Sequence, residues 1–399
     1  QWKRGRKGIW LKLAERFNEQ ESNVIWMHCA SLGEFEQGRP ILEKLKNKFP
    51  QYRLLLTFFS PSGYEIQKKT ALADDVFYLP LDSPANAKKW IKLVRPKLVF
   101  FVKYEFWYFY LKALQNQRIP VFLIAGLFRP NQLFFKWYGK GYLEVIKNFD
   151  FLFLQNESSF EIVDNEGIKN KAVIGDPRID RVAAIAQKVA PMPIIEAFKG
   201  SKKLLIVGSS HVKDWDVLRQ FILQNKTKNY FAEWQFLVAP HTLRKAEIAH
   251  MERTCPIASV RYSQTEDVKK VANQRLLILD TIGQLSRVYQ YGDGAFIGGG
   301  FDTSIHNILE PATFGLPILF GPHYQKFQEA IDLVALGSAF VVKDADELSA
   351  IFEKWQRQEW LRQMGQTSKQ YIQQNRGATE KILSYLKNKK YLFRVESRA

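Results

Sequence analysis

Short apolar runs alternate with amphipathic segments along almost the whole of this 399-residue chain. In the first half the strand-like runs occupy residues 24–29, 53–58, 97–102, 121–124 and 151–154. A second series occupies residues 203–207, 235–238, 276–279, 295–297 and 318–320. Helix-like stretches separate these runs, and such alternation is typical of βα units built around a parallel sheet.

The periodicity breaks once, at residues 189–201, where proline and glycine interrupt it. We therefore predict an α/β protein with two Rossmann-like domains, residues 1–190 and 201–399. Two doubly wound domains predict a cleft between them, with ligands at the carboxyl ends of the strands. The polar helical end of the chain, residues 347–390, has no closing strand, and we expect it to pack back on the first domain.

The charge balance indicates an anionic partner, because 58 Lys and Arg stand against 40 Asp and Glu, a net charge of +18. Nucleic acid, phosphorylated small molecules and an acidic membrane surface all fit such a field. The chain has 2 cysteines, too few for a disulfide framework, which favours a reducing compartment. It begins without methionine on a basic stretch that includes Lys3 and Arg4, which is compatible with removal of an amino-terminal anchor.

The first candidate catalytic residue is Glu34, which follows the predicted strand 24–29 and opens the next helix. The positive end of a helix stabilises a carboxylate, so we expect Glu34 to be deprotonated at neutral pH. At that position it would face the cleft and accept a proton from a substrate. The alternative is an ordinary acidic residue in a first helical turn.

Glu105 and Arg178 are further candidates, and each also has a structural interpretation. Glu105 stands among aromatic residues after the predicted strand 97–102, where a buried acid needs a partner or a task. An ion pair with Lys103 or another basic residue would satisfy it. Arg178 could hold a phosphate or carboxylate through its guanidinium fork, or it could pair with Asp176 or Asp180.

In the second half, the turn formed by Gly208, Ser209, Ser210 and His211 follows a predicted strand, where free backbone N–H groups bind phosphate. It lacks the glycine and lysine spacing of a Walker loop. Asn307 and Glu310 are three residues apart and would face the same way on one helical turn, which suits the two hydroxyls of a ribose. An ordinary helix start would explain the same pair.

No metal site is predicted. Asp214 and Asp216 lie two apart in an early helical turn and so do not share a face. The 6 histidines show no paired metal-ligand spacing along the sequence.

Taken together, the motifs of this chain resemble one family over nearly the whole length, and their order and spacing are specific although each alone is weak. The matching pieces are Ser31–Glu34, Ser60–Gly63, Tyr78–Asp82, Glu105–Trp107, Gly208–His211, Asp280–Gly283, His306–Glu310 and Gly321–His323. The chain resembles the 3-deoxy-D-manno-octulosonic acid (Kdo) transferases, which attach Kdo from CMP-Kdo to the lipid A precursor of lipopolysaccharide.

The resemblance implies the GT-B glycosyltransferase fold and an inverting, metal-independent transfer that uses no cofactor. Glu34 matches the family's general base. Glu105 and Arg178 match positions that assist the transition state.

The resemblance and the phosphate-binding turn together predict the substrate contacts. The CMP-binding set is Ser209, Ser210, His211, Pro240, His241, Ile282, Gly283, Gln284, Asn307, Ile308, Leu309 and Glu310, and the acceptor set is Ser60, Pro61, Ser62 and Gly63. The chain departs from the family's Pro-Arg-His at residues 239–241, from Gly-Gly-His-Asn at 304–307 and from Gly-Glu-Leu at 283–285.

A membrane surface is the remaining expected partner, because the acceptor is an acylated bisphosphate. Aromatic residues at 128, 134, 135, 137 and 138 interleave with basic residues at 129, 136 and 140, a pattern that suits the bilayer interface. The alternative is a helix whose aromatic side chains belong to the core. The resemblance places the protein at the cytoplasmic face of the bacterial inner membrane.

Other functions remain as alternatives. A GT-B transferase that uses a UDP-sugar would have the same fold and a different nucleotide pocket. A nucleic-acid-binding module fits the charge, but no recognisable binding motif is present. An NAD-dependent oxidoreductase is disfavoured because no Gly-x-Gly-x-x-Gly follows an early strand.

Overall fold

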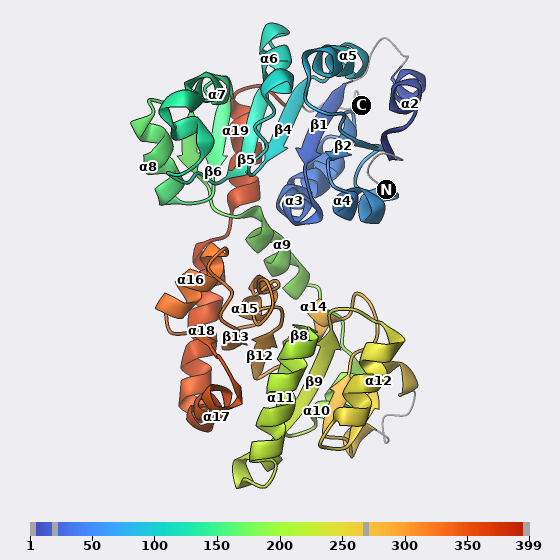
Figure 1. Cartoon of the computed structure of the whole chain (residues 1–399), viewed down its shortest axis with the longest axis vertical. Coiled ribbons are helices and arrows are strands. Elements are labelled where there is room, and N and C mark those ends of the chain that lie inside the picture. The colour runs from blue at the N-terminus through green and yellow to red at the C-terminus, as the bar shows by residue number, and fades with distance from the viewer. Residues whose placement is uncertain (1–4, 18–22, 266–270, 394–399) are drawn as a thin grey trace, which may run out of the picture. The chain divides into compact units, whose positions relative to one another are not determined.

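The computed structural model describes residues 5–17, 23–265 and 271–393, and it contains two compact units (Figure 1). Unit 1 comprises residues 1–181 and 375–399, and unit 2 comprises residues 182–374. The first division falls between Arg181 and Val182, inside helix α9 (Pro177–Ala186), whereas the sequence suggested a linker at 189–201. Lys3 and Arg4 of the basic opening lie outside the described residues.

Unit 1 is built on a sheet of seven parallel strands in the order β3-β2-β1-β4-β5-β6-β7. The strands are β1 (Val24–Cys29), β2 (Arg53–Phe58), β3 (Asp75–Tyr78), β4 (Leu98–Val102), β5 (Val121–Gly126), β6 (Phe151–Leu154) and β7 (Lys171–Val173). All five predicted strands are confirmed. The sequence missed β3 and β7, because these edge strands are short and partly exposed and so lack a continuous apolar run.

Helices cover both faces of this sheet, since successive side chains of a strand point to opposite faces. Trp26 belongs to one core and its neighbours Ile25 and Met27 to the other. The helices of unit 1 are α2 (Ile9–Arg16), α3 (Leu32–Lys48), α4 (Pro61–Gln67), α5 (Pro84–Val94), α6 (Tyr108–Asn116), α7 (Lys140–Ile146), α8 (Glu157–Asn165) and α19 (Ala378–Asn388), with the 3-10 turns η1 (Leu133–Phe135) and η2 (Trp137–Gly139).

The chain returns to unit 1 at its end. Helix α19 packs against α3 and buries Ile382, Leu383 and Leu386 in the core that contains Ile25 and Met27. The carboxylate of Asp180 accepts hydrogen bonds from the backbone N–H groups at the start of this helix, at 2.6 and 2.7 Å.

Unit 2 repeats the architecture with seven parallel strands in the order β10-β11-β9-β8-β12-β13-β14. They are β8 (Lys203–Ser210), β9 (Trp234–Pro240), β10 (Ser259–Arg261), β11 (Leu276–Ile278), β12 (Gly294–Ile297), β13 (Ile318–Phe320) and β14 (Ala339–Val341). The helices around them are α10 (Pro193–Lys199), α11 (Val212–Asn225), α12 (Lys245–Thr254), α14 (Leu285–Val288), α15 (Leu309–Thr313), α16 (Gln328–Ala335), α17 (Ala345–Lys354) and α18 (Gln358–Gln374), with the 3-10 turns η3 (Asn229–Glu233), η4 (Tyr262–Gln264) and η5 (Tyr289–Tyr291). Again the two strands missed by the sequence, β10 and β14, lie at the edges.

In each sheet the strand order reverses once, between β1 and β4 in unit 1 and between β8 and β12 in unit 2. In open α/β sheets, ligands bind outside the carboxyl ends of the strands at such a reversal. Glu34 follows β1, Glu105 follows β4, and His306 lies in the loop after β12. The prediction of a turn over residues 208–211 is wrong, because β8 continues to Ser210 and only His211 follows it. The topology therefore places the sequence candidates at the expected ligand-binding edges.

Among the described helices, none combines the length and the apolar composition that a membrane span requires.

Candidate active site

Glu34 lies in the first turn of α3, with its carboxylate folded back over the helix start. Its Oε2 accepts hydrogen bonds from the backbone N–H of Ala30 at 2.5 Å and of Ser31 at 3.2 Å. Ser31 is the N-cap, and its hydroxyl faces the Glu34 N–H at 3.5 Å, which completes a capping box. Glu34 is therefore both a member of the capping box and the candidate catalytic residue.

The expectation that Glu34 is fully ionised at neutral pH is wrong. Burial, and then the negative charge of Glu105, raise the pKa of Glu34 to about 7. The two backbone hydrogen bonds and the positive charge of Lys103 act in the opposite direction but do not compensate. Desolvation thus outweighs the helix end. A carboxylate with a pKa near the working pH is well suited to general base catalysis.

Glu105 is buried and held by two ring donors. Its Oε2 lies 3.1 Å from Nε2 of His28 and also accepts a hydrogen bond from the indole of Trp107. His28 is fully buried, and its Nδ1 lies 2.8 Å from the hydroxyl of Thr57, which accepts a hydrogen bond from the indole of Trp26 at 2.7 Å. The buried imidazole therefore orients Glu105, and His28 is one of the basic partners that the sequence analysis allowed for it. His28 was missed because it lies inside an apolar strand with no spacing signal.

Arg178 is paired with Asp176, as one of the two interpretations of the sequence predicted. Its guanidinium donates to Oδ2 of Asp176 through Nε at 2.8 Å and Nη2 at 2.5 Å. Burial would raise the pKa of Asp176, but the charge and hydrogen bonds of Arg178 outweigh burial and hold that pKa below its usual value. Gln37 and Gln155 also donate to Asp176, at 3.4 and 2.9 Å, so the pair is part of a buried polar network.

The predicted acceptor residues form the start of α4, close to the Glu34 loop. Ser60 is the N-cap of α4 and Pro61 its first residue, and the Ser60 N–H donates to the carbonyl of Ala30 at 2.7 Å. The hydroxyls of Ser60 and Ser62 lie 3.0 Å apart. A Cβ at Gly63 would fall 2.2 Å from the ring of Phe58, which explains the need for glycine there.

Unit 2 contains a cavity of about 290 Å³ at the reversal of its sheet. The residues that line it are Ser209, Gly283, Leu285, Ser286, Tyr289, Ile297, His306, Asn307 and Glu310. The cavity therefore brings together four residues of the predicted CMP set, namely Ser209, Gly283, Asn307 and Glu310. The sequence missed the other five, because most of them are small or apolar residues that carry no motif.

Asn307 and Glu310 meet at the cavity wall. The side-chain N–H of Asn307 donates to Oε1 of Glu310 at 3.1 Å. Helix α15 begins only at Leu309, so the two do not share a helical turn as predicted. Asn307 lies one residue before the N-cap, Ile308, and its side-chain oxygen accepts from the Leu309 N–H at 3.1 Å.

The remaining predicted CMP residues lie elsewhere. Ile308 and Leu309 are fully buried in the unit 2 interior, and the Ile282 side chain is 88% exposed. Pro240 ends β9 and Gln284 is the N-cap of α14.

Glycines let the loop after β12 and the loop after β13 approach each other at the edge of the unit 2 sheet. Gly299 has a left-handed φ of 88°, and a Cβ at Gly300 would lie 2.6 Å from the backbone nitrogen of Gly321. Asp214, in the first turn of α11, accepts from the N–H groups of Gly299 at 2.8 Å and of His211 at 2.7 Å. The prediction that Asp214 serves the helix start is confirmed, and its carboxylate also ties the loop after β8 to the loop after β12.

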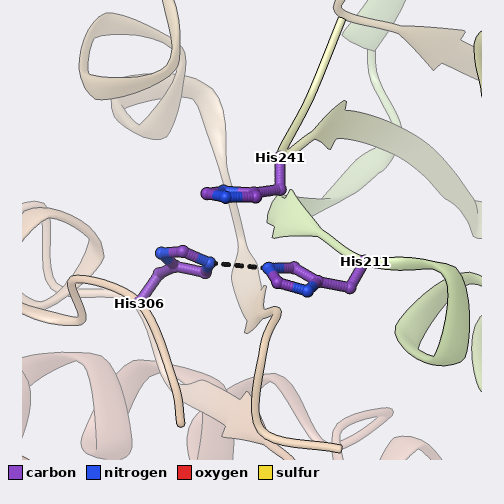
Figure 2. Close-up of side chains that lie close together, drawn as sticks. All are labelled: His211, His241 and His306. Carbon is purple, nitrogen blue, oxygen red and sulfur yellow. Dashed lines mark hydrogen bonds between the residues drawn. The ribbon is translucent and has the colours of Figure 1, made fainter. Parts of the chain in front are cut away.

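Three histidines from three different strand ends converge beside the cavity (Figure 2). Nε2 of His211 lies 2.9 Å from Nε2 of His306, and Nδ1 of His211 lies 3.1 Å from the Asp302 carboxylate. The ring of His241 stacks on both others, with centroids 4.5 Å from His211 and 4.4 Å from His306. The sequence missed this cluster because its members lie far apart along the chain.

Two of the three histidines have lowered pKa values. Burial and the other two histidines lower the pKa of His306 to about 4, and burial also lowers the pKa of His241. One ring nitrogen of each histidine lies within 4.8 Å of the others, a separation that could admit a metal ion. However, interplanar angles of 22° and 30° place the face of His241 against its neighbours, whereas metal ligation needs in-plane lone pairs that converge. The arrangement better suits hydrogen bonds to an oxyanion.

The aromatic and basic segment at 128–140 divides between core and surface. Phe128 and Phe134 are buried, so for these two residues the alternative that their side chains belong to the core is confirmed. The side chains of Trp137 and Tyr138 are 83% and 60% exposed. Together with exposed Leu133 and Tyr142, they form what we call the aromatic surface, and the side chain of Lys140 is outside the described residues.

Comparison with known proteins shows similarity to one family. The family model described as 3-deoxy-D-manno-octulosonic-acid transferase (kdotransferase) matches residues 10–181. A 3-deoxy-D-manno-octulosonic acid transferase of Aquifex aeolicus is 27% identical over 349 residues, which cover 85% of this chain and 89% of that protein. The protein of the same name in Haemophilus influenzae is 27% identical over 383 residues, 91% of this chain and 86% of its own.

Solved structures agree on the fold. The UDP-GlcNAc 2-epimerase of Neisseria meningitidis, solved with UDP-GlcNAc bound, matches with a TM-score of 0.62 at 15% identity over 92% of this chain and 100% of its own. MurG of Acinetobacter baumannii matches with a TM-score of 0.56 at 14% identity, over 92% and 100%. The two Rossmann-like units thus have the predicted GT-B architecture, and both the family model and the curated relatives show that the chain is similar to Kdo transferases, which are glycosyltransferases.

Proposed function

We propose that this protein transfers Kdo from CMP-Kdo to a lipid A precursor, a tetra-acylated disaccharide bisphosphate, with inversion at the anomeric carbon and without a metal. The observation that carries the proposal is the pKa of Glu34, raised to about 7 by burial and by Glu105 at the reversal of the unit 1 sheet. Such a group accepts a proton at neutral pH and holds it while the reaction proceeds.

Glu34 acts as the general base. Its carboxylate takes the proton from an acceptor hydroxyl, whose oxygen forms a bond to the anomeric carbon of Kdo. The bond from that carbon to the phosphate oxygen breaks, and the electron pair leaves with CMP. Glu105 keeps the proton affinity of Glu34 high, and Arg178, oriented by Asp176, offsets the negative charge that develops on the leaving group.

The donor binds in unit 2. Asn307 and Glu310 offer an amide and a carboxylate to the two ribose hydroxyls. The end of β8 at Ser209 and Ser210 and the histidine cluster receive the phosphate, and the residues around Pro240 and Ile282–Gln284 contact the cytosine. A bound phosphate favours protonation of His241 and His306, whose pKa values are lowered, and a protonated imidazole donates hydrogen bonds from both ring nitrogens.

The acceptor binds in unit 1 at a membrane surface. Ser60–Gly63 lie beside the Glu34 loop, where they would contact the disaccharide. Trp137 and Tyr138 of the aromatic surface would enter the interface of an anionic bilayer, and Arg129 nearby donates to the hydroxyl of Tyr104 at 3.4 Å. This arrangement fits a location on the cytoplasmic face of the bacterial inner membrane.

Incubation with CMP-Kdo, generated in situ, and the tetra-acylated precursor, followed by mass spectrometry of the product, tests the activity. We expect a mass increase of one or more Kdo units, unchanged by EDTA. Glu34→Ala should abolish transfer while CMP still binds, and Glu36→Ala on the same helix is the matched control. Retained turnover in Glu34→Ala would refute the general base.

Nucleotide specificity tests the donor site separately. CMP should raise the melting temperature more than UMP or UDP, and Asn307→Ala should weaken CMP binding. Preferential stabilisation by a uridine nucleotide would instead favour a transferase that uses a UDP-sugar.

A further inference from the structure

A groove of about 880 Å³ lies between helices α5 and α6 of unit 1, away from the residues discussed so far. Figure 1 shows the two helices side by side at one end of the sheet. Lys97 directly precedes β4 and Ile119 shortly precedes β5, so one end of the groove lies at the amino-terminal edge of the strands, whereas Pro84 and Phe109 in the first turns of α5 and α6 line its other end. Glu34 and Glu105 follow the carboxyl ends of strands β1 and β4, at the opposite edge. None of the proposed catalytic residues Glu34, Glu105 and Arg178 lines the groove.

The rim of the groove is basic. Lys88, Lys92 and Arg95 recur at helical spacing along one face of α5, and Lys97 and Lys112 continue the row at the end of α5 and on α6. Among the described residues that line the groove, none is acidic. The groove therefore concentrates positive charge, and its complement is an anion.

The floor of the groove is apolar. Ile91 is buried, and Phe109, Ala113 and Ile119 are partly exposed within the groove. A free phosphate or a nucleic-acid backbone would leave these side chains in contact with water. An acyl chain would cover them, and a volume of about 880 Å³ lies within the usual size range of small-molecule sites.

The groove also adjoins the aromatic surface. The ammonium group of Lys112 lies 5.9 Å from the centroid of the Tyr108 ring, and Tyr108 packs against Tyr142 with ring centroids 5.3 Å apart. Tyr142 belongs to the aromatic surface, so a lipid that enters the groove would come from the bilayer that this surface contacts. This step rests on the membrane contact included in the proposed function.

We infer that the α5–α6 groove binds one anionic phospholipid, with the phosphate among the lysines of the rim and part of an acyl chain on the apolar floor. The site would hold unit 1 on the bilayer independently of the acceptor.

Titration of the full-length protein with short-chain phosphatidylglycerol, dispersed below its micelle concentration, tests the site. Calorimetry should detect one bound lipid per chain, and glycerol phosphate, which lacks acyl chains, should bind about tenfold more weakly or worse. Lys92→Glu with Lys112→Glu should reduce lipid affinity by about tenfold or more. The matched control is Lys89→Glu with Lys381→Glu, an equal charge change at two exposed lysines outside the groove.

Several results would overturn the inference. Equal loss in both double variants would mean that only net charge matters. Equal binding of glycerol phosphate would mean that the floor plays no part, and displacement of the lipid by a short RNA would assign the groove to nucleic acid. A phosphatidylglycerol carrying a benzophenone on its acyl chain should crosslink to peptides of α5 or α6, and crosslinks confined to other elements would also refute the site.

The test separates this inference from the proposed function. Both double variants should transfer Kdo at the normal rate to acceptor dispersed in neutral detergent. Absence of transfer in the unmodified protein would contradict the proposed activity, whereas lipid binding in the groove would still be measured directly.

Discussion

At the scale of single residues, Glu34 and Glu105 illustrate how one carboxylate sets the properties of another. His28 and Trp107 hold Glu105 in place, and the negative charge of Glu105 adds to burial in raising the pKa of Glu34 to about 7. Where two carboxyl groups are neighbours, the one whose surroundings raise its pKa is the candidate for proton transfer, and here that group is Glu34.

Glu105→Gln should shift the pH dependence of transfer. Removal of the negative charge lowers the pKa of Glu34, so the rise of kcat/KM with increasing pH should occur at lower pH, by about one unit. Glu36→Gln, which changes a charge on the same helix that does not influence the Glu34 pKa, should leave the profile in place. A rise that stays near pH 7 in Glu105→Gln would contradict the coupling.

The histidine cluster predicts proton uptake on donor binding. Burial and the two neighbouring histidines lower the pKa of His306 to about 4 from its ordinary value of 6.5, and a neighbouring phosphate raises it. CMP should therefore bind with uptake of protons as the pH falls from about 7 toward 5, measured by calorimetry in buffers of different ionisation enthalpy. The phosphate's own titration, near pH 6, is common to all variants. His306→Gln should reduce the uptake, and an unchanged uptake would remove the cluster from the phosphate site.

At the scale of elements, loops after parallel strands bring the candidate residues together, and small residues permit the approach. The motif residue Asp82 accepts from the N–H groups of Phe109 and Tyr110 at 3.1 Å and so caps α6 from a distant loop. Gly300 and Gly321 let two loops of unit 2 pass with their backbones in contact. Several family motifs therefore have structural roles in the elements that carry the site.

Gly300→Ala should disturb the donor site. The new Cβ would meet backbone atoms of Gly321 that have no flexible end to move, so we expect a loss of about 1–3 kcal/mol in the free energy of unfolding and weaker CMP binding. Gly141→Ala in α7 is the control, because an added Cβ there meets nothing within 4 Å. Denaturant unfolding and CMP thermal shifts measure both effects, and unimpaired CMP binding in Gly300→Ala would contradict the close approach.

At the scale of the whole molecule, the chain passes from unit 1 to unit 2 and back, so unit 1 is completed by residues from both ends of the sequence. Tyr385 of α19 packs on Phe151 and Phe153 of β6, with ring centroids 4.2 and 5.4 Å away. Unit 1 therefore depends on a segment that follows the whole of unit 2.

Leu386→Ala should destabilise unit 1 selectively. Leu386 is fully buried, so its truncation should cost about 2–5 kcal/mol, whereas Lys387→Ala at the exposed neighbouring position should cost little. Hydrogen exchange should show reduced protection in the strands of unit 1 and unchanged protection in those of unit 2. Equal loss in both units would contradict the assignment of α19.

The sequence by itself determined the strand interiors, the loops that follow them and the family motifs, because buried parallel strands require continuous apolar runs and turns require particular residues. Glu34, Glu105, Asn307 and Glu310 could be found for this reason. Only the tertiary structure decided which strands are neighbours, and thus the meeting of His211, His241 and His306, the support of Glu105 by His28 and the return of α19. It also set the pKa of Glu34, since burial and the approach of a second charge depend on packing between segments distant along the chain.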